Sequence, residues 1–112
     1  MGLSFMKNEH IVEKMLGCIS KISEYTKHID YNSFEKNSMV VEACVFNLSL
    51  MGEYAHKAEQ EFCELYPEIP WNTIYGLRNR IVHDYEGVNL ILIWEIIKEN
   101  LPELEEQLRR IL

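Results

Sequence analysis

The apolar residues of this chain recur at steps of three and four, which is the spacing of helices that bury one face. No run of residues alternates as a strand does, and no Asn-Gly or Asp-Gly turn joins two such runs. The pattern predicts helices over 8–29, 33–56, 72–87, 90–100 and 103–112, with a short helical turn over 61–66. Amphipathic helices with short connections predict an all-α, up-down bundle of four to five helices.

Helix-capping and helix-breaking residues set the expected ends of these segments. Asn8 is expected to cap the first helix, and the turn-forming cluster 30–33 to end it. Pro67 and Pro70 stop the second helical stretch, because each lacks an N–H and disfavours helix in the residue before it. The remaining signals are a cap at Asn72 or Thr73 and an end at Gly87 for the third helix, and Pro102 in the first turn of the last.

The length and charge of the chain narrow the function classes. With 112 residues, it is long enough for one domain, 1–112, and too short for two. It carries 11 Lys and Arg residues against 18 Asp and Glu, a net charge of −7. That balance argues against a broad surface that coats nucleic acid, although a small basic site for one phosphate stays open.

The sequence indicates neither a membrane span nor a secretion signal. The longest apolar run, 90–94, is far shorter than the roughly 20 residues that cross a bilayer. The N-terminus has no charged segment followed by an apolar one. Three widely spaced cysteines without a CxxC pair indicate free, mostly buried thiols: Cys18, Cys44 and Cys63. We therefore expect a cytoplasmic protein with no disulfide, zinc site or other cofactor.

The third predicted helix has two chemically different faces, given about 100° of rotation per residue. One face is an apolar stripe that should contact the core: Ile74, Leu77, Ile81 and Tyr85. Arg78 lies at the edge of this stripe, and His83 lies on the opposite side of the helix. Beside His83 are Asn79 and Arg80, together with Gly76, whose missing side chain leaves room for a ligand or another helix.

These residue types suit phosphodiester chemistry on RNA. The 2′-OH of RNA is a built-in nucleophile, so a protein needs only a general acid or base near neutral pH and a cation for the charge that develops on the phosphate. Histidine supplies the first and arginine the second, without a metal ion. The alternative is purely structural: His83 is a solvated surface residue, and Arg80 pairs with Asp84 one turn on.

The segment 78–85, Arg-Asn-Arg-Ile-Val-His-Asp-Tyr, has the form R-x4-H-x-Y. It resembles the motif of the HEPN superfamily, and specifically the HepT-like toxins that are paired with minimal nucleotidyltransferase antitoxins. The resemblance extends from about Asp30 onward. It includes Gly52-Glu53, the Pro-Glu-Ile-Pro-Trp segment at 67–71, the Gly-Leu-Arg-Asn segment at 76–79 and the Leu-Pro-Glu-Leu segment at 101–104.

The resemblance implies a function. HepT-like proteins are all-helical homodimers that act as metal-independent endoribonucleases, through internal attack of the 2′-OH that leaves a cyclic phosphate. By this likeness Arg78 and His83 are the catalytic pair, and Asn79 matches the polar residue that commonly follows the motif arginine; Arg80 is a supporting candidate from its place beside His83 on the helix. Tyr85 matches the tyrosine that the partner nucleotidyltransferase adenylylates to silence the toxin. The implied partners are an RNA substrate, that antitoxin and a second copy of the chain, with a higher assembly with the antitoxin also open.

Arg78 and His83 raise a geometric question, since residues five apart diverge by about 140° on an ideal helix. Two hypotheses answer it. Either the helix loosens near His83, or the working pair combines side chains across a two-fold axis. Glu53 also has two interpretations: a surface pair with His56 on its own helix, or a carboxylate that orients Arg78.

Two other function classes remain compatible with the sequence. One is a catalytically silent HEPN module that binds and regulates a nucleotidyltransferase, which the acidic balance suits somewhat better than RNA binding. The other is a generic helical bundle that dimerises. Cleavage of RNA by the purified protein, or its absence, separates the enzyme from both.

Overall fold

The computed structural model describes residues 3–84 and 89–112, with the side chains of 7–81 and 89–112. Over these residues the chain is helical and contains no strand. The order is α1 (Leu3–Thr26), α2 (Tyr31–Lys36), α3 (Ser38–Lys57), α4 (Gln60–Leu65), α5 (Trp71–Asp84), α6 (Leu90–Glu95), the π-helical segment η2 (Ile96–Asn100) and α7 (Leu101–Ile111). The predicted all-α bundle is therefore confirmed.

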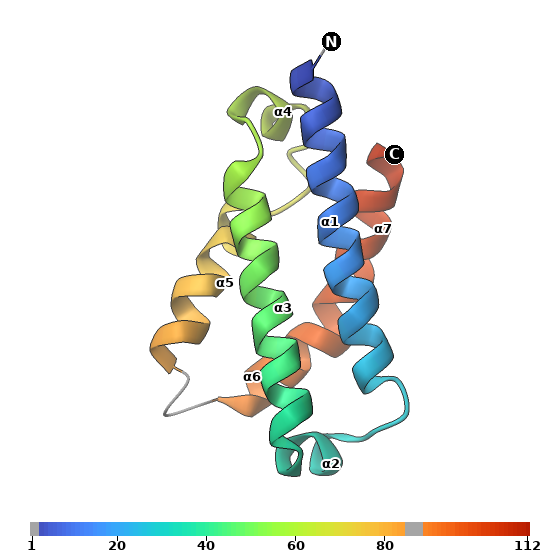
Figure 1. The fold of residues 1–112 in the computed structure, drawn as a ribbon, viewed down its shortest axis with the longest axis vertical. Helices are drawn as coiled ribbons and strands as arrows, with labels where there is room; N and C mark the ends of the chain where they lie inside the picture. Colours follow the sequence, from blue (N-terminus) through green and yellow to red (C-terminus); the bar gives the residue numbers. More distant parts are fainter. Residues whose placement is uncertain (1–2, 85–88) are drawn as a thin grey trace.

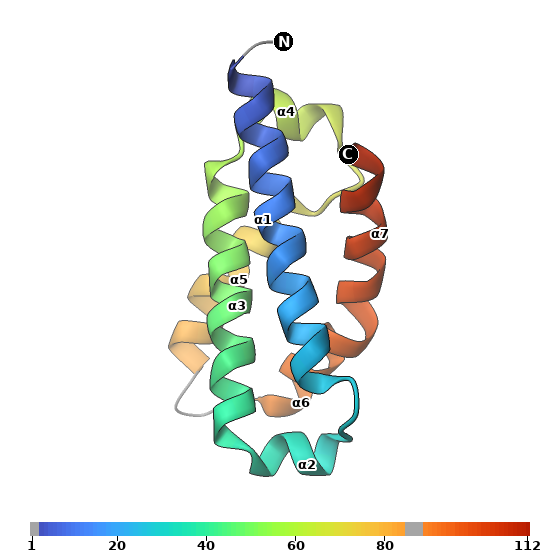
Figure 2. The ribbon, with the colours of Figure 1, turned by 45° about the vertical axis from the view of Figure 1, so that its right-hand side comes forward.

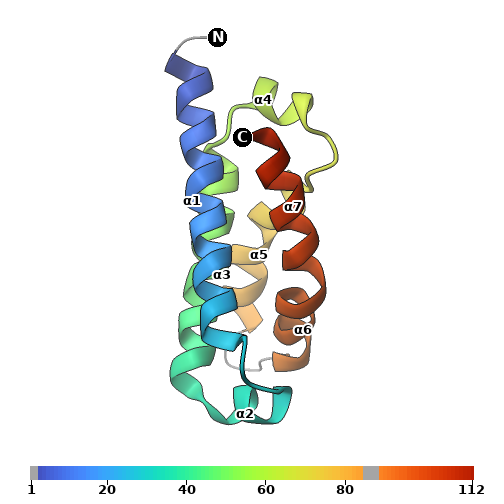
Figure 3. The ribbon, with the colours of Figure 1, turned by 90° about the vertical axis from the view of Figure 1, so that its right-hand side faces the viewer.

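The long helix α3 is the centre of the bundle. It packs against α1 on one side and against α5 on the other, and these are the two most extensive helix contacts. Figure 2 shows α7 beside α1, and Figure 3 shows α6 and α7 following one another along the same side of the bundle. The short helices α2 and α4 lie across the two ends. Among the described residues, the most extensive contact of α5 is therefore with α3.

The core follows the predicted helical spacing. Ile74, Leu77 and Ile81 of α5 are buried, as the apolar stripe predicted, whereas Tyr85 lies outside the described residues. Trp71 is buried as well, and Trp94 is half-buried against Phe34 with ring centroids 4.9 Å apart. The hydrophobic core therefore forms from one face of each long helix, and the opposite faces are left for function.

Two predicted helix boundaries were wrong, both at asparagines. The first helix begins at Leu3, and Asn8 is buried inside it, where its side-chain oxygen accepts the Glu59 N–H at 3.1 Å. Asn8 thus ties α1 to the start of α4 rather than capping its own helix. The predicted stretch 33–56 is two helices, because Asn37 ends α2 and caps α3 by accepting the Val40 N–H at 3.2 Å.

The remaining boundaries differ by smaller amounts. The first helix ends at Thr26, and Asp30 caps α2 through the Ser33 N–H at 2.8 Å. The helix α5 begins at Trp71, one or two residues before the predicted caps, and the predicted end at Gly87 lies outside the described residues. Pro102 is in the first turn of α7, as predicted, but α7 continues directly from the wider π-helical turn of η2. A wider turn suits this place, because Pro102 cannot donate to the carbonyl four residues back.

Candidate functional site

The helices α3 and α5 cross at Gly52, which is buried between them. A Cβ atom at this position would lie 3.0 Å from the Ile74 carbonyl oxygen and 3.3 Å from Cβ of Arg78. A contact this short is tighter than nine in ten real Cβ contacts, so a larger residue would require the backbone of α5 to shift away from α3 by a few tenths of an ångström. The glycine therefore fixes how closely α5 approaches α3, and with it the position of Arg78.

The next residue along α3 receives Arg78. A guanidinium nitrogen of Arg78 forms an ion pair with Oε1 of Glu53. The side chains are 50% and 34% exposed, so the pair lies at the surface beside the crossing. An exposed pair contributes only about 0–1 kcal/mol to stability. The pair instead orients the Arg78 side chain. The carboxylate accepts from only part of the guanidinium, which has five N–H donors, so other N–H groups can bind an incoming anion.

A second contact joins the same two helices one turn further along. The rings of His56 and Tyr75 are stacked, with centroids 4.3 Å apart and an angle of 22° between their planes. His56 is exposed and Tyr75 is half-buried. Of the two interpretations of Glu53, the structure supports the pairing with Arg78, because Glu53 and His56 each contact a residue of α5. No group of three or more potential metal ligands occurs among the described residues.

The other predicted site residues lie on different parts of α5. Asn79 is exposed, whereas Arg80 lines a groove of about 370 Å³ between α5 and the segment formed by α6, η2 and α7. Arg80 is thus on a different flank from Arg78, and the structure does not bring the two cations together. His83 is in the helical backbone of α5, but its side chain lies outside the described part, and so does the whole of Tyr85.

The backbone of α5 bears on the geometry of the motif. It is α-helical through Asp84, so Arg78 and His83 keep the divergence of about 140° that an ideal helix gives them. No loosening of the helix occurs between them. Gly76 lies on an open part of α5, since no described atom comes within 4 Å of the place a Cβ would occupy. A ligand or a second chain can approach the helix closely there.

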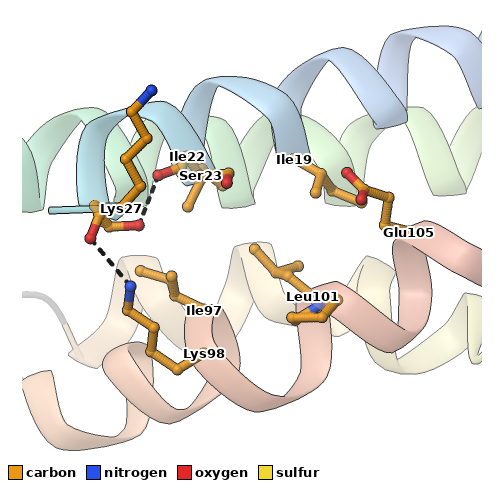
Figure 4. A pocket seen from close by; sticks show the side chains of 10 residues that line it. Ile19, Ile22, Ser23, Lys27, Ile97, Lys98, Leu101 and Glu105 are labelled. Carbon is orange, nitrogen blue, oxygen red and sulfur yellow. Dashed lines mark hydrogen bonds between the residues drawn. The ribbon is translucent and has the colours of Figure 1, made fainter.

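The cavity shown in Figure 4 is a separate feature on the α1 and α7 side of the bundle, with a volume of about 400 Å³. None of the described residues that line it belongs to α5. Two lysines line it: Lys27 pairs with Glu24 at 3.1 Å, and Lys98 donates to the Thr26 carbonyl at 3.0 Å and lies 4.6 Å from the ring centroid of Trp94. Lys98 therefore holds α1 to η2 and is not directed at a phosphate.

The thiols do not form a reactive site. Cys18 and Cys44 are buried and Cys63 is half-buried, and all three are free, as predicted. Burial raises the pKa of the Cys44 thiol to about 11, against a smaller lowering by Lys98. Burial also raises the pKa of Cys18 and Cys63. A thiol with a raised pKa is a poor nucleophile and metal ligand.

Comparison with known proteins places the crossing of α3 and α5 in a family context. The family described as "Ribonuclease HepT-like" matches residues 15–111, which include the crossing and the whole R-x4-H-x-Y segment. The chain belongs to the ribonuclease HepT-like family. The predicted resemblance is therefore confirmed at the level of the family. None of the described helices is long and apolar enough to cross a membrane.

Several proteins named as ribonucleases resemble the chain over most of its length. The chain is 37% identical over 93 residues to "Putative RNase MJ1380" of Methanocaldococcus jannaschii, covering 83% of this chain and 85% of that protein. It is 36% identical over 104 residues to "Putative RNase TTE0752" of Caldanaerobacter subterraneus, covering 93% and 89%. It is 31% identical over 110 residues to "Probable ribonuclease HepT" of Thermococcus cleftensis, covering 94% and 100%. No solved structure matches it.

Sequence reasoning left one part of this site unpredicted. The pairing of Glu53 with Arg78 was one of the two interpretations that the sequence allowed. The stacking of His56 on Tyr75 was not predicted. Gly52 was the available signal, because a glycine inside a helix often marks a place where another backbone comes close.

Proposed function

We propose that this HepT-like chain is a metal-independent endoribonuclease in which Arg78 and His83 cleave RNA. The observation that carries the proposal is the Arg78–Glu53 pair, in which the motif arginine is held at the surface of the motif helix by a neighbouring carboxylate. A half-exposed guanidinium with free N–H groups binds a phosphate well. The family relationship and the names of the relatives support the same substrate class.

The proposed reaction balances with the residues of the motif. The 2′ oxygen of RNA attacks the adjacent phosphorus, and a histidine acting as general base takes its proton. The bond from phosphorus to the 5′ oxygen breaks, and the protonated histidine returns its proton to the departing 5′ oxygen. The products are a 2′,3′-cyclic phosphate and a 5′-OH. Arg78 stabilises the charge that develops on the phosphoryl oxygens, and His83 serves as the base or acid.

We further propose that the working site forms between two copies of the chain. The α-helical backbone of α5 from Arg78 to His83 favours this hypothesis over local loosening, because positions five apart on an ideal α-helix diverge by about 140°. The surface of α3 offers an apolar face to a second copy: Met39 is 80% exposed and Phe46, two turns along the helix, is 65% exposed. A two-fold pairing would bring Arg78 of one copy toward His83 of the other.

We propose that a minimal nucleotidyltransferase regulates the enzyme by adenylylating Tyr85, as the motif implies. The added AMP would place a negative phosphate two residues from His83 and compete with the substrate phosphate for Arg78. Co-expression with the cognate nucleotidyltransferase should yield a chain whose mass increases by one AMP at Tyr85. Modification at another residue, or none, would count against this part of the proposal.

A second candidate is a silent module that binds the nucleotidyltransferase without cutting RNA. The net charge of −7 favours it, since strong RNA binding usually requires positive charge. The two candidates differ in a single measurable respect, which is whether the purified chain cleaves RNA.

Incubation of purified protein with RNA in excess chelator tests the proposal. Arg78→Ala and His83→Ala should each reduce cleavage by at least about a hundredfold, since each removes a group that acts in the transition state. Arg109→Ala is the matched control, because Arg109 also forms an exposed ion pair, with Glu105 on α7 at 3.7 Å. Cleavage that survives in both motif variants, or an inactive parent protein, would refute the proposal.

A further inference from the structure

The stacked rings of His56 and Tyr75 lie next to the Arg78–Glu53 pair. The helices α3 and α5 run antiparallel, so a step of three residues forward from Glu53 to His56 matches a step of three back from Arg78 to Tyr75. These two contacts are therefore about 4.5 Å apart along the helix axis. An aromatic surface thus adjoins the guanidinium on the same side of the crossing.

The stacked rings form part of the wall of a surface hollow. Its volume is about 750 Å³, and it lies where α3, α4 and α5 meet. His56, Tyr75 and the buried ring of Trp71 line it, together with the exposed amide of Asn72. A hollow of this size admits a nucleobase, and an exposed imidazole offers it a flat ring for stacking. Gly76 is next to Tyr75, and no described atom lies within 4 Å of the place its Cβ would occupy, so an RNA strand can approach α5 there.

The charge balance of the chain favours RNA contacts that do not depend on positive charge. The net charge is −7, Arg78 is already paired with Glu53, and Glu64 lines the hollow with its carboxylate held by Gln60 at 3.1 Å. Attraction to phosphates alone is therefore weak here. Stacking of bases on aromatic side chains does not depend on the charge of the protein and tolerates any base.

We propose that the His56–Tyr75 stack is a base-binding platform for the nucleotide beside the phosphate that Arg78 contacts. The ligand class is single-stranded RNA: a base stacks on the exposed ring of His56, and the Asn72 amide meets its edge. This inference rests on the proposed function, because it takes Arg78 as the phosphate contact. It adds a subsite that acts in binding and not in the chemical step.

Binding of an oligonucleotide that cannot be cleaved tests the platform separately from catalysis. The probe is a fluorescein-labelled, single-stranded 2′-O-methyl RNA decamer of mixed sequence, titrated with protein and followed by anisotropy. A second probe has the same backbone but lacks bases in its central positions. The parent protein should bind the complete probe about tenfold more tightly than the abasic probe.

Matched variants separate stacking from general effects on the fold. Tyr75→Phe keeps the ring and should leave binding of the complete probe unchanged. Tyr75→Leu and His56→Ala should each weaken it about three- to tenfold and leave the abasic probe unaffected. The controls are Tyr54→Leu, a half-buried tyrosine of α3 outside the hollow, and His28→Ala, another exposed histidine. Urea unfolding of each variant verifies the fold.

Two results would overturn the platform. One is equal affinity of the parent protein for the complete and abasic probes. The other is equal binding of the complete probe by the folded Tyr75→Phe and His56→Ala proteins. If the parent protein still cleaves RNA in either case, only the platform is wrong and the proposed function stands. A parent protein that neither binds the probe nor cleaves RNA overturns both.

Discussion

Replacing Gly52 with alanine should separate the close approach of α3 and α5 from ordinary helix propensity. Alanine in place of glycine inside a helix is favourable by about 0.8–1 kcal/mol when nothing opposes it. At Gly52 the added Cβ would lie 3.0 Å from the Ile74 carbonyl oxygen, and a backbone atom cannot yield as a flexible side chain does. Overpacking of this kind costs about 1–3 kcal/mol.

The chain contains matched controls for this substitution. Gly17 and Gly76 are also inside helices, and no described atom lies within 4 Å of a Cβ built on either. Gly17→Ala should therefore stabilise the protein by about 0.5–1 kcal/mol. Gly52→Ala should be less stable than Gly17→Ala by about 1–3 kcal/mol, the cost of the overpacking alone.

Urea unfolding followed by far-ultraviolet circular dichroism measures these differences, and RNA cleavage by the same samples measures their consequence. Because Cβ of Arg78 would lie 3.3 Å from the new methyl group, Gly52→Ala should also lower cleavage while the protein remains folded. If Gly52→Ala stabilises the chain as much as Gly17→Ala does, the two helices are not in close contact at this residue. Gly52 would then not determine the position of Arg78.

Three further predictions follow from particular contacts. Glu53→Gln should lower cleavage about ten- to a hundredfold through loss of orientation, with a change in unfolding free energy below about 1 kcal/mol; Glu105→Gln, equally exposed and also paired with an arginine, should leave cleavage unchanged. The raised pKa of Cys44 leaves little thiolate at pH 8, so iodoacetamide should label the half-buried Cys63 first and Cys44 only after unfolding. Mass spectrometry measures the order of labelling, and early labelling of Cys44 would contradict its burial. Asn37→Ala should lower the unfolding free energy by about 1 kcal/mol, since it removes the side-chain cap of α3, and an unchanged urea midpoint would argue against that cap.

The fold was predictable from the sequence where one helix face decides the outcome. The spacing of Ile74, Leu77 and Ile81 determines which side of α5 meets the core, and the structure buries all three. Boundaries failed where an asparagine had more than one use. Asparagine is a common helix cap, but the side-chain oxygen of Asn8 accepts the N–H of Glu59 at the start of α4, fifty-one residues along the chain. Such a contact depends on how α1 and α3 pack, which no local pattern contains.

The candidate site shows the same division between local and tertiary information. The motif pointed to Arg78 and His83 because it is defined by residue types and spacing within one short segment, which the sequence shows directly. The partners of α5 were harder to predict, since Glu53 and His56 meet it only because α3 crosses it at Gly52. Helical spacing predicts Arg80 beside His83; the structure shows that Arg80 lines the groove toward α7, and the side chain of His83 lies outside the described residues. Contacts across a crossing require the angle and register of both helices, and the sequence of either helix alone contains neither.

The chemical groups at the ends of the cleaved RNA reveal whether the 2′-OH is the nucleophile. An RNA with a single cleavage site is incubated with the purified chain in excess chelator, and the fragments are weighed by mass spectrometry. The proposed mechanism predicts a 2′,3′-cyclic phosphate on one fragment and a 5′-OH on the other, and no cutting when the 2′ oxygen at that site is methylated. Fragments with a 3′-OH and a 5′-phosphate, or cleavage of the methylated RNA, would show that water and not the 2′-OH is the nucleophile, and would contradict it.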